Sequence, residues 1–227
     1  MGLSRTLKTL RSRWFGTVSI DDPRPVAAAS PYTFWLPPAE HLEALRPGDL
    51  VKVIVRPHPC DRTFDAERMW FSVQKIEGDD IFATLVNVPT DMPQLKVGAE
   101  LRLHKAQVVD IDWADGREQP PSVPQKCYWD RCLVDSCIVD GSSLVDFLYR
   151  EEPDMGAEGE HYPDSGWRIR GSDEKIAEDE ASGRAPQYVA LGLVLNRDDR
   201  WLDLIDAPVG SAFRWSDIEG CFMEICE

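Results

Sequence analysis

The sequence predicts an α+β protein of two small domains, a mostly antiparallel β domain followed by a mixed α+β domain. Short apolar segments with alternating side chains, separated by Gly-Asp and Pro-Gly turns, occupy the first half. A proline-rich stretch over residues 114–126 has the composition of a linker. The balance of charge changes at the same place. With 227 residues, two domains of roughly 100 residues each are long enough to bury their own cores.

The charge of the chain is acidic and is concentrated in the second half. There are 25 Lys and Arg against 40 Asp and Glu, a formal net charge of −15. Residues 1–120 have a net charge of −2, and residues 121–227 have one of −13. This excess of acids argues against a general nucleic-acid binder, because affinity for phosphate needs Lys and Arg. The acidic surface either keeps the protein soluble or steers a basic partner toward it.

Residues 1–19 are expected to form a basic N-terminal helix. Leucines and Trp14 recur there at helical spacing between arginines and lysines, which gives one apolar stripe. The helix either packs on the following domain or attaches weakly to a membrane surface. The charges are not followed by the apolar segment that a signal peptide needs, and no stretch of about 18 apolar residues predicts a transmembrane helix.

Residues 20–113 are expected to form the β-rich domain. Five prolines within residues 20–38 predict an extended lead-in rather than a helix, and Pro47-Gly48 ends a short helical turn near residues 40–45. The turn at residues 78–80 predicts a hairpin, and residues 57–66 and 87–98 predict loops. Alternating apolar residues predict five strands: 49–56, 68–75, 81–86, 99–104 and 108–113. Together they indicate a curved, mostly antiparallel sheet or a small, partly open barrel.

Residues 127–227, after the linker 114–126, are expected to form an acidic α+β domain. The apolar segment 131–139 predicts a strand, and the polar segment 173–183 is a solvated helix or a loop. The segment 187–195 fits either a helix or a strand, and its composition favours a helix. The remaining expected strands are 144–150 (or the end of a helix), 166–170, 211–215 and 221–225.

The sequence contains no motif that predicts catalysis, a cofactor or a metal. A Gly-rich phosphate loop, a nucleophile elbow and a paired-histidine zinc motif are all missing from it. The spacing of five between some cysteines lies at the edge of the zinc range, so reduced thiols in a cytoplasmic protein are expected instead. His58 and Cys60 would share a face of an extended segment, but the neighbouring prolines favour an exposed loop. The cysteines in question are Cys127, Cys132, Cys137, Cys221 and Cys226.

A loop over residues 151–165 is dense in acids. Carboxylates this close repel one another and stay exposed unless a cation neutralises them. Their order does not match a calcium loop. The loop is therefore either a solvated surface or a docking site for Lys and Arg of a partner. Its acids are Glu151, Glu152, Asp154, Glu158, Glu160 and Asp164.

Several segments of the second half, together spanning residues 130–217, follow one pattern. They begin with CLVDSCIV at Cys132, FLYREEPD at Phe147 and DSGWR at Asp164, and continue with GSDE at Gly171, LVLNRDDRWL at Leu193 and DAPVGSAF at Asp206. In this order they resemble one bacterial domain family, the group thirty-three immunity proteins of polymorphic toxin systems. The segment 155–162 looks like an insertion relative to that pattern. The first half resembles another bacterial domain, without a known function, through PGDLVK at Pro47, ERMWFSV at Glu67 and LKVG at Leu95.

The resemblance implies a cytoplasmic immunity or inhibitor protein, not an enzyme, that binds a cognate toxin. The acidic charge of the second half predicts that this toxin is basic. The charge and the missing motifs predict no cofactor, no nucleic acid and no stable membrane association, and the oligomeric state stays open. The alternatives are a small-molecule-binding or hydrolytic enzyme with a site between the two domains, or a regulatory scaffold. An interface with a basic partner needs acidic side chains, and most interfaces also have a buried anchor residue, often Trp. We therefore predict a partner-binding set: Glu151, Glu152, Asp154, Asp164, Trp167, Asp198 and Asp199.

Overall fold

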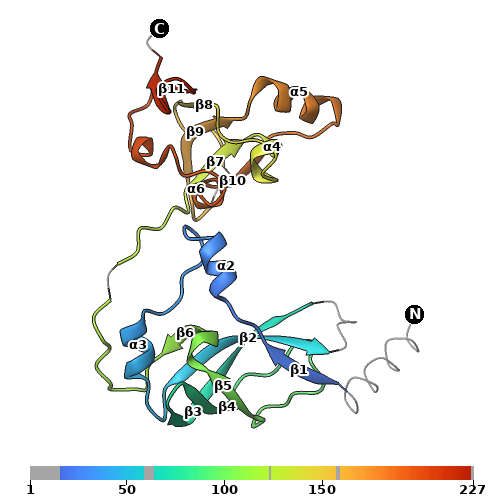
Figure 1. Cartoon of the computed structure of the whole chain (residues 1–227), viewed down its shortest axis with the longest axis vertical. Coiled ribbons are helices and arrows are strands. Elements are labelled where there is room, and N and C mark those ends of the chain that lie inside the picture. Colours follow the sequence, from blue (N-terminus) through green and yellow to red (C-terminus); the bar gives the residue numbers. More distant parts are fainter. Residues whose placement is uncertain (1–15, 59–63, 123, 157–158, 226–227) are drawn as a thin grey trace, which may run out of the picture. The chain divides into compact units, whose positions relative to one another are not determined.

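The computed structural model describes residues 16–58, 64–122, 124–156 and 159–225 (Figure 1). The chain divides into two compact units, each with its own core. The described residues up to Ala29 and Phe34–Pro124 form the N-terminal unit. Ser30–Thr33 and the chain from Gln125 onward form the C-terminal unit. The expected helix over residues 1–19 lies largely outside the described residues.

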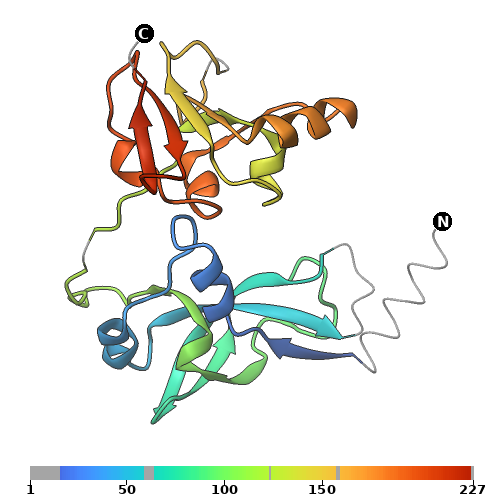
Figure 2. The ribbon, with the colours of Figure 1, turned by 45° about the horizontal axis from the view of Figure 1, so that its top comes forward.

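The N-terminal unit is a curved, nearly closed antiparallel sheet of six strands. Strands β1 to β5 pair in sequence order, and β6 returns to pair with β2 (Figure 2). β1 and β6 share one edge of β2, and β3 takes the other edge. The strands are β1 (Thr17–Ile20), β2 (Leu50–His58), β3 (Glu67–Glu77), β4 (Asp80–Leu85), β5 (Glu100–His104) and β6 (Val108–Asp112).

Alternation in the sequence explains this sheet. Val51, Val53 and Val55 of β2 are buried while their neighbours are not, as a period of two requires. The same alternation in β3 and β4 buries Met69, Phe71 and Ile81 in one core. The predicted α+β class, with a curved or partly open N-terminal barrel, is confirmed.

Two expectations for the N-terminal unit are wrong. The lead-in contains a helix, α2 (Arg24–Ala29), because Pro25 lies in the first turn, where a helix needs no N–H from it. Pro31 then ends the helix, since a residue before proline avoids the helical region. His58 lies in β2 rather than in a loop, and its Nε2 is 2.8 Å from Ser19 Oγ of β1. Cys60 lies outside the described residues.

The other helices of this unit are short. The expected turn near residues 40–45 is α3 (Ala39–Ala44), and a single 3-10 turn, η1 (Lys105–Gln107), connects β5 to β6. Arg117, from the proline-rich stretch, pairs with the buried carboxylate of Asp49 and donates to the Ala44 carbonyl. The beginning of that stretch therefore packs on the N-terminal unit.

The C-terminal unit is a mixed sheet with helices on one face. The strand order is β10-β7-β9-β8-β11-β12, in which β7 and β9 are parallel and all other neighbours are antiparallel. The strands are β7 (Arg131–Val134), β8 (Phe147–Arg150), β9 (Asp164–Arg170), β10 (Gln187–Ala190), β11 (Ala212–Ser216) and β12 (Cys221–Glu224). The helices are α4 (Ser136–Val139), α5 (Asp173–Ala181), α6 (Leu191–Leu195) and the 3-10 turn η2 (Leu202–Leu204).

One face of this sheet forms the core with α4, α6 and η2. Trp167 and Ile169 of β9 and Leu148 of β8 point to it and are buried against Val194 and Trp201. None of the described helices is long and apolar enough to cross a membrane.

Two segments of this unit differ from expectation. The strand expected over 131–139 ends at Val134, and Asp135 then precedes helix α4 while its carboxylate accepts hydrogen bonds from Arg170 and Gly171. The helix favoured over 187–195 is instead strand β10 followed by helix α6. The polar segment 173–183, left open between helix and loop, contains α5.

Candidate functional site

The centre of the acidic loop is a buried ion pair between Asp164 and Arg168, both on β9. Two guanidinium nitrogens of Arg168 donate to the two Asp164 carboxylate oxygens at 3.0 and 2.9 Å. The side chains are 1% and 3% exposed, respectively. Burial alone would raise the pKa of Asp164. The hydrogen bonds from Arg168 and from the N–H groups of Gly166 and Met155 outweigh burial and lower this pKa.

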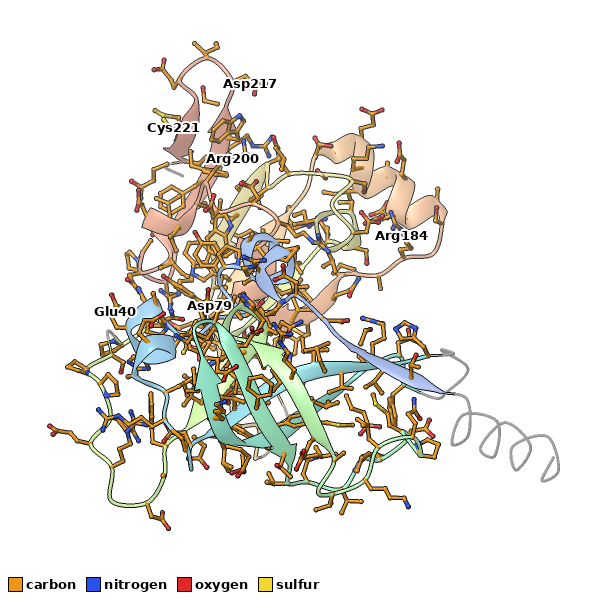
Figure 3. All side chains as sticks on the ribbon, turned by 60° about the horizontal axis from the view of Figure 1, so that its bottom comes forward. Glu40, Asp79, Arg184, Arg200, Asp217 and Cys221 are labelled. Atoms are coloured by element: carbon orange, nitrogen blue, oxygen red, sulfur yellow. The ribbon has the colours of Figure 1, made fainter. Side chains whose placement is uncertain are left out.

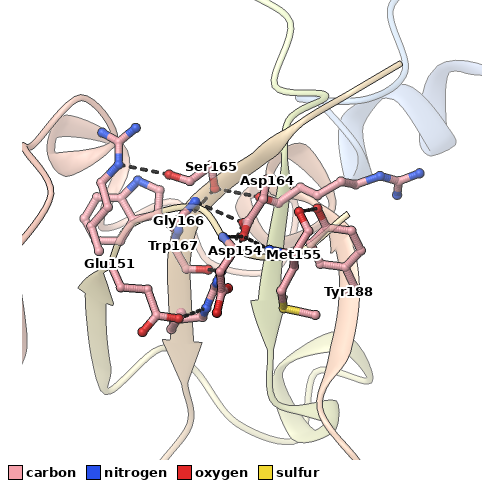
Figure 4. Close-up of polar contacts among 11 residues, drawn as sticks. Glu151, Asp154, Met155, Asp164, Ser165, Gly166, Trp167 and Tyr188 are labelled. Atoms are coloured by element: carbon pink, nitrogen blue, oxygen red, sulfur yellow. Dashed lines mark hydrogen bonds and ion pairs between the residues drawn. The ribbon is translucent and has the colours of Figure 1, made fainter. Parts of the chain in front are cut away.

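Two further carboxylates from the preceding loop, those of Glu151 and Asp154 (labelled in Figure 4), contact the same guanidinium. Glu151 pairs with Arg168 Nε, and Asp154 Oδ1 lies 2.7 Å from its Nη2. The Asp164 hydrogen bond and the pairing with Glu151 raise the pKa of Arg168. The side chain of Glu151 is 43% exposed and that of Asp154 is 71% exposed. We call Glu151, Asp154, Asp164 and Arg168 the Arg168 cluster. With three carboxylates and one arginine, the cluster has a net negative charge.

The backbone around the cluster is shaped by Gly166. Its φ is +79°, and a Cβ built on it would lie 2.1 Å from the Glu151 carbonyl oxygen. The Glu151 N–H donates to the Gly166 carbonyl at 3.0 Å, and the N–H groups of Asp154 and Met155 donate to Asp164 Oδ2. The loop over Glu151–Met155 is thus fixed to β9 at several points.

Trp167 is fully buried on the core face of β9, the face opposite to that of Arg168. Its indole N–H donates to the Ile205 carbonyl at 3.1 Å, and its ring meets Trp201 edge-on at 5.9 Å. It therefore packs in the core and does not face a partner in this structure.

Asp198 and Asp199 belong to a separate place on the unit. Asp198 is buried, accepts from the Val145 N–H at 2.8 Å and pairs with Arg200 at 2.6 Å. The Arg200 guanidinium lies 3.9 Å from the centre of the Trp215 ring, below the hairpin turn that carries Asp217 (Figure 3). Asp199 is exposed and accepts from the Tyr32 hydroxyl at 2.7 Å, and this hydrogen bond raises the pKa of Tyr32 to about 12.

The structure thus separates the seven predicted residues into two groups by burial. Asp164, Trp167 and Asp198 are buried and position other groups. Glu151, Glu152, Asp154 and Asp199 keep surface to the solvent. The sequence reasoning missed Arg168, the cation that neutralises part of the loop. Its position four residues after Asp164 was the available signal, because residues on the same strand at even spacing share a face.

The cysteines and histidines form no site among the residues that the structure describes. No group of three metal-ligating side chains occurs there. Cys132 and Cys137 are free and buried, whereas Cys127 and Cys221 are free and exposed. Burial raises the pKa of the Cys137 thiol to about 11, which disfavours the reactive thiolate.

The C-terminal unit is therefore an α+β domain whose mixed sheet presents a fixed acidic loop. Residues 132–226 match the family model described as the Immunity protein Imm33 domain. The C-terminal part of the chain is thus similar to that immunity family, as the sequence segments indicated, and the match supports an immunity function. Neither the curated proteins nor the solved structures contain a match to the chain. The resemblance of the first half to another domain stays a prediction.

Proposed function

We propose that this chain binds and neutralises a cognate bacterial toxin, and that the acidic surface of its C-terminal unit attracts the toxin. The observation that carries the proposal is the Imm33 match, which spans nearly all of the C-terminal sheet. An immunity protein acts by binding, so the proposal requires no catalytic group in this chain. We propose the cytoplasm as the place of action.

The charge of the unit supports fast association with a basic toxin. Residues 121–227 have a net charge of −13, and Asp154 is largely exposed at the top of the Arg168 cluster. Complementary charge raises association rates far more than it changes dissociation rates. Because Arg168 holds Glu151 and Asp154 in place, the loop presents its charge without having to order on binding.

The buried and exposed residues have different roles in this proposal. Glu152, Asp154 and Asp199 contact the partner or attract it electrostatically. Asp164 and Trp167 are positioning residues, since they fix the loop and the strand below it.

A pair of substitutions tests the acidic loop without unpairing Arg168 completely. Glu152→Lys with Asp154→Asn should lower the association rate constant about three- to tenfold at low salt, because both remove negative charge from the loop. The difference should shrink at high salt, where charges are screened. The measurement is surface plasmon resonance with the candidate toxin domain, at about 0.05 and 0.5 M salt.

A control pair makes the same chemical changes in the other unit. Glu118→Lys with Asp115→Asn alters the net charge equally at exposed positions of the proline-rich stretch. It should leave the association rate near that of the wild type. Equal association rates for both pairs would remove the acidic loop from the mechanism, and no binding by the wild-type chain would overturn the proposed function.

A further inference from the structure

The C-terminal sheet has a second face that no described helix covers. Strand register places its residues in rows across the sheet, because paired residues share a face. One row contains Arg170, Phe147, Arg214 and Met223 from four successive strands. The next row contains Leu133, Arg168, Tyr149 and Ala212. Glu151 and Asp154 cover Arg168, so that end of the second row is closed. We call the uncovered part, Phe147, Tyr149, Ala212, Arg214 and Met223, the open face.

The exposure of these residues differs from that of the opposite face. Leu148, Trp167 and Phe213, which point to the helices, are buried. Phe147 and Tyr149 are only half-buried, and Met223 and Ile225 are exposed. Phe147 and Tyr149 stack on each other at 5.6 Å. Aromatic residues, Met and Arg are the types enriched in the centres of protein interfaces.

The open face also contains a hollow. It has a volume of about 410 Å³ and lies beside the β8–β11 pair. Its lining consists of Phe147, Tyr149, Ala212 and Ile225, together with Arg150 and residues 210–211. A hollow of this size and lining accepts an apolar or aromatic side chain. An anchor side chain in such a pocket typically dominates the affinity of an interface.

The charge beside the hollow is opposite to that of the unit as a whole. Arg214 lies 5.2 Å from the centre of the Phe147 ring, and no carboxylate within the described ranges pairs with it. Arg170, which lies on the other side of Phe147 in the same row, pairs with the buried Asp135 at 2.7 Å. Arg214 is therefore a cation beside Phe147, one of the aromatic residues that line the hollow, in a unit where acids outnumber bases.

We propose that the open face is the docking surface for the toxin, and that the hollow takes an apolar side chain of the toxin that neighbours a carboxylate bound by Arg214. This inference rests on the proposed function. It adds a short-range apolar contact with the toxin, which the charged acidic loop does not provide. The acidic loop attracts the toxin over a distance, and the hollow holds it after contact.

The test fills the hollow and reverses the cation separately. Ala212→Trp places a large ring in the hollow, and Arg214→Glu reverses the charge beside it. Each should weaken toxin binding by at least about tenfold, mainly through faster dissociation. Arg197→Glu is the matched control, since Arg197 is exposed at the end of α6 on the other side of the sheet. It should bind like the wild type.

The outcomes separate this inference from the proposed function. Wild-type binding with unchanged affinity for both open-face variants overturns the inference and leaves the proposed function standing. Where Ala212→Trp fails to fold, amide hydrogen exchange of the wild-type complex decides. Toxin-induced protection of residues 212–216 and 221–224 supports the inference, and unchanged exchange there overturns it.

Discussion

Arg168 is the residue on which the acidic loop depends. We expect Arg168→Ala to lower the free energy of unfolding of the C-terminal unit by about 3–5 kcal/mol, because it leaves the buried Asp164 carboxylate without a cation. The double variant Asp164→Asn with Arg168→Met should lose clearly less, since it removes both charges. Urea unfolding at neutral pH followed by circular dichroism measures both. A loss in Arg168→Ala no larger than in the double variant would contradict this account.

The lowered pKa of Asp164 predicts how stability changes with acid. A carboxylate whose pKa is lower in the folded state stabilises the fold fully above its ordinary pKa of 3.8, and this contribution is lost as pH falls through the folded pKa. Between about pH 5 and pH 2, the wild type should therefore lose more stability than Asp164→Asn. Parallel acid titrations of the two proteins, followed by tryptophan fluorescence, check the difference. Identical slopes would show that Asp164 does not contribute.

At the scale of elements, β9 and its glycine fix the path of the acidic loop. Gly166→Ala should destabilise the unit by more than about 3 kcal/mol, because the new Cβ meets the Glu151 carbonyl as well as straining the backbone. Gly183→Ala is the control, since Gly183 also has a positive φ but nothing within 4 Å. It should cost only the strain, about 1–2 kcal/mol. Thermal unfolding of both variants decides, and equal losses would argue against the close contact.

The elements that the sequence predicted well are those that alternate. Val51, Val53 and Val55 indicated β2 because one face of that strand is buried and the other is not. The segment 187–195 was harder, because Val189 and Leu191 are both apolar and the change from strand to helix at Ala190 leaves no break in hydrophobicity. Helix α2 was missed because two prolines flank its start, where they are compatible with a helix.

The candidate site was only partly predictable for a related reason. The acids at Glu151 and Asp154 stand out in the sequence, but their partner Arg168 lies 14 or more residues further along. The burial of Trp167 and Asp198 depends on α6 and η2 packing against the sheet, which no local pattern records. The residues of the open face could not be predicted either, because they are brought together by the strand order, in which β8 pairs with β11 across a long stretch of chain.

At the scale of the whole molecule, Ser30–Thr33 completes the C-terminal unit from far upstream. The Tyr32 N–H donates to Asn196 Oδ1 at 2.9 Å, Asn196 donates to Thr33 Oγ1 at 2.7 Å, and Gly192 leaves room for the Tyr32 carbonyl. We expect Tyr32→Ala to increase amide hydrogen exchange in α6 while β2 and β3 stay unchanged. Tyr32→Phe, which loses only the hydroxyl, should have a smaller effect. Unchanged exchange in α6 would show that this segment does not stabilise the unit.

The same segment has a consequence for how the protein is made. Tyr32 leaves the ribosome 164 residues before Asn196, and nearly all of the N-terminal unit is synthesised in between. At typical rates of translation the delay is roughly ten to thirty seconds. Tyr32 and Thr33 remain without their partners through that period, while the β sheet that contains Val51 and Phe71 is synthesised. The C-terminal unit can therefore close only near the end of biosynthesis, so a nascent chain that stops before Asn196 has not yet acquired the complete immunity-like domain.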